Sequence, residues 1–219
     1  MTTRRSVNYN GDIPAPADAP PLDPSVDPRK RILRAADRLM YAKGYEAVGV
    51  AELCREAGVQ KGSFYHFFAS KQDLALEMLD RSWARTRRAI FAAAFDDESR
   101  TAVESITVYG ELLAEHLDAG RSDVGVVAGC RYGNFAVELS AHDDAIRAKI
   151  EAIFAEMTGV LVGTIRRGVD AGDVRADIDA EQAAADVLAV MEGLMVMAKA
   201  RQDPASLQRL GALSALVLD

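Results

Sequence analysis

Residues 48–74, VGVAELCREAGVQKGSFYHFFASKQDL, decide which fold the sequence predicts. Their first apolar positions have the spacing of one helical face: Val50, Leu53, Cys54 and Ala57. Gly58 interrupts this pattern, and glycine is the residue that most easily ends a helix in the left-handed conformation. A second short helix is expected over residues 61–67. The sequence therefore predicts two helices joined by a tight turn.

The second of these helices is expected to present polar side chains to solvent. Phe64 and Phe67 are expected to point inward, which leaves the outward positions to Lys61, Ser63, Tyr65 and His66. Lysine contacts phosphates or guanine, and the other three side-chain types supply hydrogen bonds to a DNA surface. Two helices across a glycine turn, the second with outward donors, have the geometry that enters a DNA major groove.

This stretch resembles the helix-turn-helix signature of the TetR family of bacterial transcriptional repressors. The matching positions are residues 57–59, residues 61–68 and Lys71. The DNA contacts that the resemblance implies are Gln60, Lys61, Gly62, Ser63, Tyr65, His66 and Lys71, the last three of them on phosphates. Gly49 stands where the family usually has a capping threonine, and Gln60 stands where serine is common.

Charge is distributed unevenly along the chain. The net charge is −7, yet residues 28–88 hold 13 Lys or Arg and 7 Asp or Glu, whereas residues 89–219 hold 11 and 22. A basic segment beside an acidic one indicates a DNA-binding head on a body that does not bind nucleic acid. Arg29 is one of four basic residues at the start of the first helix, so we expect it near phosphate; a solvated basic face is the alternative.

The pattern predicts an all-α fold with three parts. Residues 1–27 hold most of the prolines and almost no large apolar residue, which predicts a disordered tail. Alternatively, Arg4 and Arg5 of this tail reach into a DNA minor groove. Residues 28–75 are expected to form a three-helix DNA-binding domain, and residues 76–219 a helical ligand-binding and dimerisation domain.

Local signals predict where helices begin and end. Asp27-Pro28 is expected to start the first helix, and Ser70 to cap one that runs to about Phe95. A later helix is expected to end near Gly120, and a short one to cover residues 134–139. The last three helices are expected to start at Ser140 with Asp143, at Asp179 with Gln182, and at Asp203-Pro204.

The last two helices are apolar over more than one stripe, so something besides their own body is expected to cover them. The resemblance supplies a partner, because TetR-like proteins form two-fold dimers through their C-terminal helices as a four-helix bundle. The expected interface residues are Val187, Met191, Leu194, Leu210 and Leu213. Packing within one chain, or a ligand pocket lined by the methionines, is the alternative.

Cys130 is the residue that we expect to take part in sensing. Residues 129–134, GCRYGN, followed by Glu138-Leu139, resemble a pattern of one TetR subgroup, some members of which respond to acrylate-like or electrophilic compounds. Arg131 and a helix that begins after Gly133 would favour the reactive thiolate. A small buried side chain at a helix junction is the alternative. The other candidate ligand residues are Asn134, Tyr109 and Trp83, the last with the core as its alternative place.

These features predict a TetR-like repressor that binds a palindromic operator in double-stranded DNA as a homodimer and is released by a small-molecule or electrophilic inducer. A ligand-independent activator or architectural protein is the alternative. An enzyme is disfavoured because no nucleophile–base spacing is present. The two cysteines form no metal or disulfide pattern, so no metal or other cofactor is expected. No secretory signal or apolar run of about 18 residues is found, which predicts a cytoplasmic protein without a membrane segment.

Overall fold

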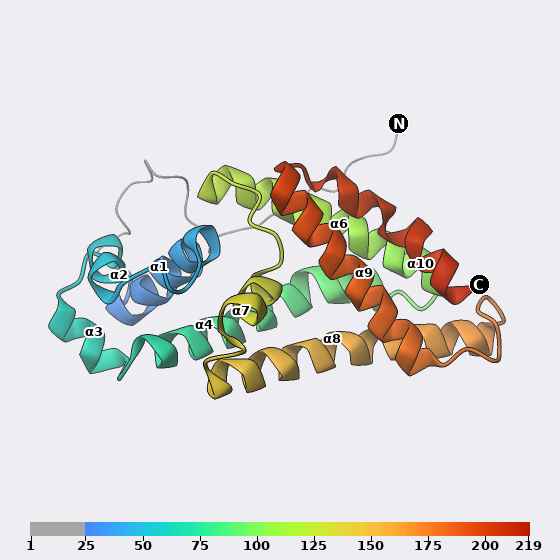
Figure 1. Cartoon of the computed structure of the whole chain (residues 1–219), viewed down its shortest axis with the longest axis horizontal. Coiled ribbons are helices and arrows are strands. Elements are labelled where there is room, and N and C mark those ends of the chain that lie inside the picture. Colours follow the sequence, from blue (N-terminus) through green and yellow to red (C-terminus); the bar gives the residue numbers. More distant parts are fainter. Residues whose placement is uncertain (1–24) are drawn as a thin grey trace.

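The computed structural model describes residues 25–219, in which every regular element is helical. The all-α prediction is confirmed, while most of the predicted tail, with Arg4 and Arg5, lies outside the described residues. The head contains α1 (Pro28–Lys43), α2 (Val50–Ala57), α3 (Lys61–Phe67) and the start of α4 (Lys71–Thr86). Figure 1 shows α3 at one end of an elongated molecule, with α4 leading from it into the body.

Helix α1 begins, and α2 ends, where the sequence predicts. The Asp27 carboxylate accepts a hydrogen bond from the Lys30 N–H at 3.1 Å, and Pro28 occupies the first turn of α1. Gly58 ends α2 with φ at +60°, a left-handed conformation that costs glycine little. Gly49 begins α2 without a side-chain cap. The tight turn after Gly58 therefore sets the orientation of α3 relative to α2.

A single helical rod leads from the head into the body. Ser70 Oγ caps α4 with a 3.0 Å hydrogen bond from the third residue of the helix. The rod continues through a π-helical turn at Arg87–Phe91 into α5 (Ala92–Phe95), so the predicted end of this helix is confirmed. Such turns are rare and often lie at functional sites. This one carries two buried side chains, Ile90 and Phe91.

The body consists of α6 (Ala102–Val124), α7 (Arg131–Leu139), α8 (Asp144–Ala171), α9 (Ala180–Arg201), a 3₁₀ helix (Pro204–Arg209) and α10 (Leu210–Leu218). Two boundaries differ from the prediction. Helix α6 passes Gly120 and ends only at Gly125, where φ is +83°. Helix α7 begins three residues before the predicted start, because the Cys130 sulfur caps its first turn.

The starts of the last helices are partly as predicted. Asp179 caps α9 as expected, but Asp143 caps α8 alone, since Ser140 belongs to the end of α7. Asp203-Pro204 starts the 3₁₀ helix, and α10 follows from it. Within the described residues, no helix is long and apolar enough to cross a membrane, and no group of His, Cys, Asp or Glu has a metal-binding arrangement.

Helix α10 packs closely on α6 through two glycines. A Cβ atom at Gly110 would lie 2.6 Å from the Leu207 carbonyl oxygen, and one at Gly211 would overlap the side chain of Thr107. Side chains at these positions would force the two helices apart. The close approach buries Leu207 and Leu210 completely, so the last helix completes the core of its own chain.

Candidate DNA-binding face and effector cavity

Helix α3 presents most of the predicted DNA contacts on one exposed face at the end of the molecule (Figure 1). The fully buried Phe64 anchors this helix in the head, and its ring meets the Tyr65 ring edge-on with 5.2 Å between centroids. Tyr65 is 52% exposed. The exposed face brings together Gln60, Lys61, Gly62, Tyr65 and His66, with Ser63 partly buried beside them.

Two predicted DNA contacts hold the head together. The Arg29 guanidinium donates to both oxygens of the Glu77 carboxylate, one of them at 2.7 Å. The Lys71 ammonium donates to the carbonyl oxygens of Tyr45 and Val48 at 3.2 and 3.3 Å, and it lies 3.9 Å from the centre of the Tyr45 ring. Both cations are therefore occupied within the chain. These contacts position the helices of the head, and the contact of Arg29 and Lys71 with phosphate stays a prediction.

A cavity of about 60 Å³ lies where α1, α4, α6, α7, α8 and α9 meet. Two predicted ligand residues, Cys130 and Tyr109, line it. Trp83 does not line it but lies in the core, where its ring packs on Phe91 and its Nε1–H donates to Glu156 at 2.8 Å. Much of the remaining lining consists of aromatic, aliphatic and methionine side chains and one histidine: Tyr41, Ile90, Phe91, Leu113, His116, Met157, Met191 and Met195.

Asn134 lies beside a second, wider hollow of about 870 Å³, which shares Cys130 with the smaller cavity. The Asn134 side chain donates to the Ala128 carbonyl oxygen at 2.8 Å and accepts from the Lys199 ammonium at 2.9 Å. These bonds tie the start of α7 to the preceding loop and to α9. Asn134 therefore shapes the surroundings of Cys130 and does not line the smaller cavity.

Burial keeps two titratable residues of the smaller cavity, Tyr109 and His116, uncharged. It raises the pKa of the Tyr109 hydroxyl well above its usual value, and it lowers the pKa of His116 to about 4, with Arg131 and Arg85 adding to the effect. His116 is therefore neutral at physiological pH. Three charged residues, Asp37, Arg85 and Arg131, also line the cavity and form one cluster, in which Asp37 lies 3.0 Å from Arg85 and 3.1 Å from Arg131. The apolar lining away from this cluster favours an uncharged ligand over an ion.

The surroundings of Cys130 oppose a reactive thiolate. Cys130 is 9% exposed, burial raises the pKa of its thiol well above the usual value, and the adjacent Glu192 carboxylate raises that pKa further. The Gly133 N–H, 3.4 Å from the sulfur, acts in the opposite direction but more weakly. Arg131 points to Asp37. Burial and Glu192 therefore oppose the thiolate that Arg131 and the start of α7 were expected to favour, and the part of Cys130 in sensing stays a prediction.

We expect Cys130 to react slowly with iodoacetamide at neutral pH. The Glu192→Gln variant should react up to about tenfold faster, because a thiol pKa that falls by one unit yields about ten times more thiolate. The rates are to be measured in a Cys54→Ser background, so that Cys130 is the only thiol that can react. Glu181→Gln, an exposed change on the same helix, is the control. Equal rates in all three proteins would show that Glu192 does not suppress the thiol.

Two family models match the chain. The model described as "Bacterial regulatory proteins, tetR family" covers residues 32–78, and the one described as "Tetracyclin repressor-like, C-terminal domain" covers residues 111–213. The chain belongs to the TetR family of transcriptional regulators. Its membership of the subgroup with the GCxxGN pattern stays a prediction.

Relatives and solved structures agree with this assignment. The chain is 28% identical over 148 residues to the HTH-type transcriptional repressor DhaR of a Mycobacterium species, a match that covers 64% of this chain and 70% of the relative. It is 33% identical over 122 residues to the transcriptional regulator AcuR of Cereibacter sphaeroides, covering 54% of this chain and 52% of the relative. The crystal structure of a regulatory protein TetR from Rhodobacter sphaeroides aligns with a TM-score of 0.78 and 26% identity over 87% of this chain and 98% of that one. The reduced form of Escherichia coli NemR has the same fold, with a TM-score of 0.73 and 21% identity over 88% of this chain and 98% of that one.

In this TetR-family regulator, α7 connects the smaller cavity to the head. At its start, the Arg131 guanidinium pairs with Asp37 of α1. Near its end, the Glu138 carboxylate accepts hydrogen bonds from the N–H groups of Tyr45 and Glu46 at 2.9 and 2.7 Å. Asp37 belongs to α1, and Tyr45 and Glu46 belong to the loop before α2. A displacement of α7 therefore acts directly on the head.

Sequence reasoning missed Asp37 and the contacts that Arg131 and Glu138 make with the head. The partners are 92 to 94 residues apart in sequence, and no local periodicity reports such a pairing. The one available signal was Glu138 itself, which belongs to the pattern that follows GCRYGN.

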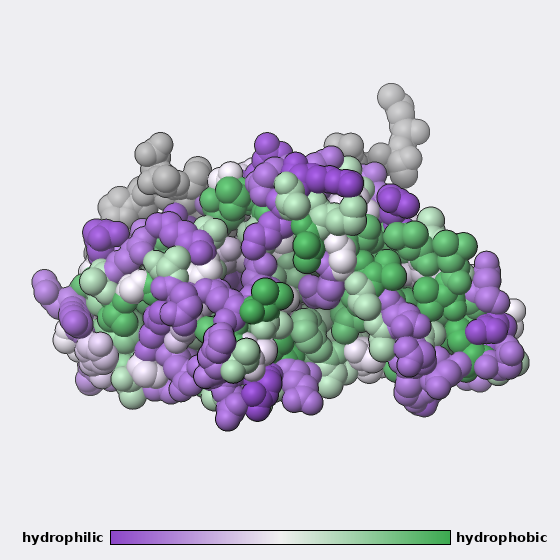
Figure 2. Space-filling view, in the orientation of Figure 1, coloured by the Kyte–Doolittle hydropathy of each residue, from purple (hydrophilic) through white to green (hydrophobic). Residues whose placement is uncertain are grey.

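Most of the predicted dimer residues lie inside a single chain. Val187, Met191, Leu194 and Leu210 are buried without a partner, and Leu213 is partly buried. The prediction that the first four face a second copy is wrong, because they complete the core between α6, α9 and α10. One exposed stripe of α9 consists of Ala185, Ala189, Gly193, Val196 and Ala200, beside the exposed Asp186, Met197 and Lys199. Figure 2 shows hydrophobic surface gathered over α9 and α10, away from the end that carries α3.

Proposed function

We propose that this regulator is a transcriptional repressor that binds a palindromic operator as a homodimer and leaves it when a small neutral molecule enters the cavity beside Cys130. The observation that carries this proposal is the position of α7, since Cys130 at its start lines the cavity and Glu138 near its end holds the loop after α1. TetR-family regulators bind operator DNA and act as dimers with small-molecule ligands. Such a repressor would act in the cytoplasm, where its operator lies.

The exposed face of α3 supports the DNA-binding half of the proposal. Gln60, Lys61 and Ser63 are proposed to meet base edges, and Tyr65 and His66 to meet phosphates, with Gly62 allowing the backbone to approach. Two heads of a symmetric dimer require half-sites about one helical turn of DNA, or a multiple of it, apart.

The size and lining of the cavity define the class of effector. About 60 Å³ is the space of about two water molecules, so a larger effector has to enlarge the cavity. Met157, Met191 and Met195 allow this, because methionine adopts many shapes. Enlargement would displace α7 and break the hydrogen bonds of Glu138 to the head. An effector that binds this displaced arrangement more tightly lowers the affinity for the operator.

The outer faces of α8 and α9 are the proposed dimer interface. On α9 the stripe from Ala185 to Ala200 has no charged side chain, and Val196 is 62% exposed. Small residues on the exposed side of α8 allow close approach of a second chain: Ala152, Ala155 and Gly159. Four helices, two from each copy, would then pack across a two-fold axis.

The experiment is a mobility-shift titration of the purified chain on DNA from upstream of its gene, followed by a screen of small neutral molecules for release. We expect one discrete complex that competitor DNA of unrelated sequence does not remove. Reporter expression with and without the regulator separates repression from activation. If no sequence-specific complex forms, the proposal is wrong.

A matched pair of variants tests the route from the cavity to the head. Glu138→Gln removes the charge that holds Tyr45 and Glu46, so it should weaken operator binding and lower the effector concentration needed for release. Glu111→Gln, an exposed change on α6 and outside the proposed dimer interface, should alter neither. Identical effector titrations for both variants would disprove the route through Glu138.

A further inference from the structure

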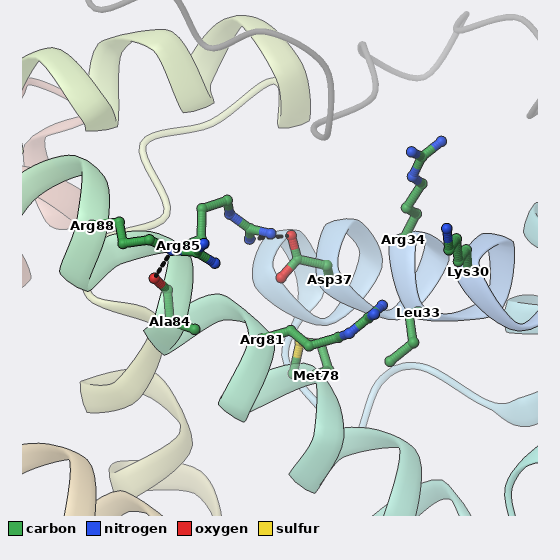
Figure 3. A pocket seen from close by; sticks show the side chains of 9 residues that line it. All are labelled: Lys30, Leu33, Arg34, Asp37, Met78, Arg81, Ala84, Arg85 and Arg88. Carbon is green, nitrogen blue, oxygen red and sulfur yellow. Dashed lines mark hydrogen bonds and ion pairs between the residues drawn. The ribbon is translucent and has the colours of Figure 1, made fainter.

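A separate, basic cavity of about 380 Å³ lies in the groove between α1 and α4 (Figure 3). It is lined by Lys30, Leu33, Arg34 and Asp37 from α1 and by Met78, Arg81, Ala84, Arg85 and Arg88 from α4. Five of these nine side chains are cationic and one is a carboxylate. This composition contrasts with the whole chain, in which 33 acidic residues outnumber 26 Lys and Arg.

The single carboxylate does not balance the cations around it. The Asp37 oxygens pair with Arg85 at 3.0 Å and with Arg131 at 3.1 Å, so this carboxylate is shared between two guanidinium groups. Figure 3 shows Arg85 reaching from α4 to Asp37 on α1. Arg81 lies 3.8 Å from the Glu77 carboxylate, which also binds Arg29. Even apart from Arg34, four cations line the groove beside the one carboxylate of Asp37, so the groove is basic.

The arginine wall of the groove lies away from the face that reads DNA. Arg81, Arg85 and Arg88 follow Lys71, the first residue of α4, by 10 to 17 positions, which at 1.5 Å per residue is about 15 to 25 Å along the helix. The start of α4 is next to α3, so these arginines lie beside the body. Contact of α3 with a major groove does not account for them.

We propose that this groove binds a small anion that carries two or more phosphate or carboxylate groups, and that binding lowers operator affinity. Guanidinium groups match both kinds of anion through paired hydrogen bonds. A ligand with two anionic groups can bridge Lys30 on α1 to Arg81 and Arg88 on α4, which a single carboxylate cannot. It would also compete with Asp37 for Arg85 and so loosen a link between the two helices. The effect on the operator rests on the proposed function, whereas binding of the anion does not.

The binding test is a calorimetric titration of the full chain with pyrophosphate and, separately, with citrate, at constant ionic strength and without DNA. Saturable binding of at least one of them is expected, and the comparison identifies the preferred anionic group. The double variant Arg81→Gln, Arg88→Gln should bind at least about tenfold more weakly, because two charge-assisted contacts are lost. Arg166→Gln, Arg175→Gln removes two exposed charges from the body and should bind like the wild type.

The second readout is operator release at constant ionic strength. Pyrophosphate should release the wild type and the body variant at lower concentration than the groove variant, and thermal melts confirm that all three are folded. Absence of saturable binding by either anion, or equal binding by both double variants, would overturn the proposal. So would a groove variant that binds the anions normally but has lost operator affinity, since the groove would then contact the DNA backbone.

Discussion

Replacing Phe64 by alanine should lower the free energy of unfolding by about 3–5 kcal/mol and abolish operator binding. Phe64 is fully buried and is the one side chain of the seven-residue α3 that lies completely inside the head. Its ring packs against Phe68 with 6.0 Å between centroids. Because so short a helix has little stability of its own, losing this anchor should release α3 from the head.

The neighbouring Tyr65 provides the matched control. Its side chain is 52% exposed and its ring meets Phe64 edge-on, so Tyr65→Ala should lower the free energy of unfolding by about 0.5–1.5 kcal/mol, less than Phe64→Ala. Its affinity for the operator should nevertheless fall, by about tenfold for a lost interaction of about 1.4 kcal/mol. Urea unfolding followed by circular dichroism measures the stability, and fluorescence anisotropy with labelled operator measures the affinity. Wild-type affinity in Tyr65→Ala would mean that α3 does not present this face to DNA.

The head could be predicted closely because its signals are local. The Asp27-Pro28 start of α1 and the left-handed Gly58 act within a few residues of themselves. The roles of Arg29 and Lys71 could not be predicted in this way. Glu77, the partner of Arg29, is 48 residues away, and Lys71 binds backbone carbonyls that carry no sequence signal. A basic residue beside a DNA-binding motif can bind phosphate or fasten the motif, and composition does not separate the two.

In the body, too, the contacts between residues distant in sequence could not be predicted. The apolar stripes of α9 and α10 predict burial, but they do not tell whether the covering surface belongs to the same chain. Gly110 and Gly211 decide this by letting α10 approach α6, which places Leu210 in the core. The environment of Cys130 was equally hidden, because burial and then Glu192, which is distant in sequence, raise the pKa of the thiol against the effect expected from the start of α7.

The largest effect in the body is expected for Gly193→Glu, which should separate the dimer and abolish operator binding at the same time. Gly193 lies on the exposed stripe of α9, and a Cβ atom there would have no neighbour within 4 Å in the single chain. The change should not destabilise the fold, because glutamate in a helix interior is more favourable than glycine by up to about 1 kcal/mol. Two copies would bring two like charges together at the symmetry axis without water around them, so the dimer dissociation constant should rise by at least about a hundredfold, or about 2.7 kcal/mol.

Two further variants separate the interface from the core. Ala119→Glu adds the same charge to an exposed position of α6 and should leave the dimer intact. Leu194→Ala, one residue from Gly193 but buried, should lower the free energy of unfolding by about 2–5 kcal/mol without selectively separating folded chains. Sedimentation velocity gives the oligomeric state, and footprinting on a palindromic operator gives DNA binding. A dimeric Gly193→Glu would place the interface elsewhere. A monomeric Gly193→Glu that still protects both half-sites would show that operator binding does not require the dimer.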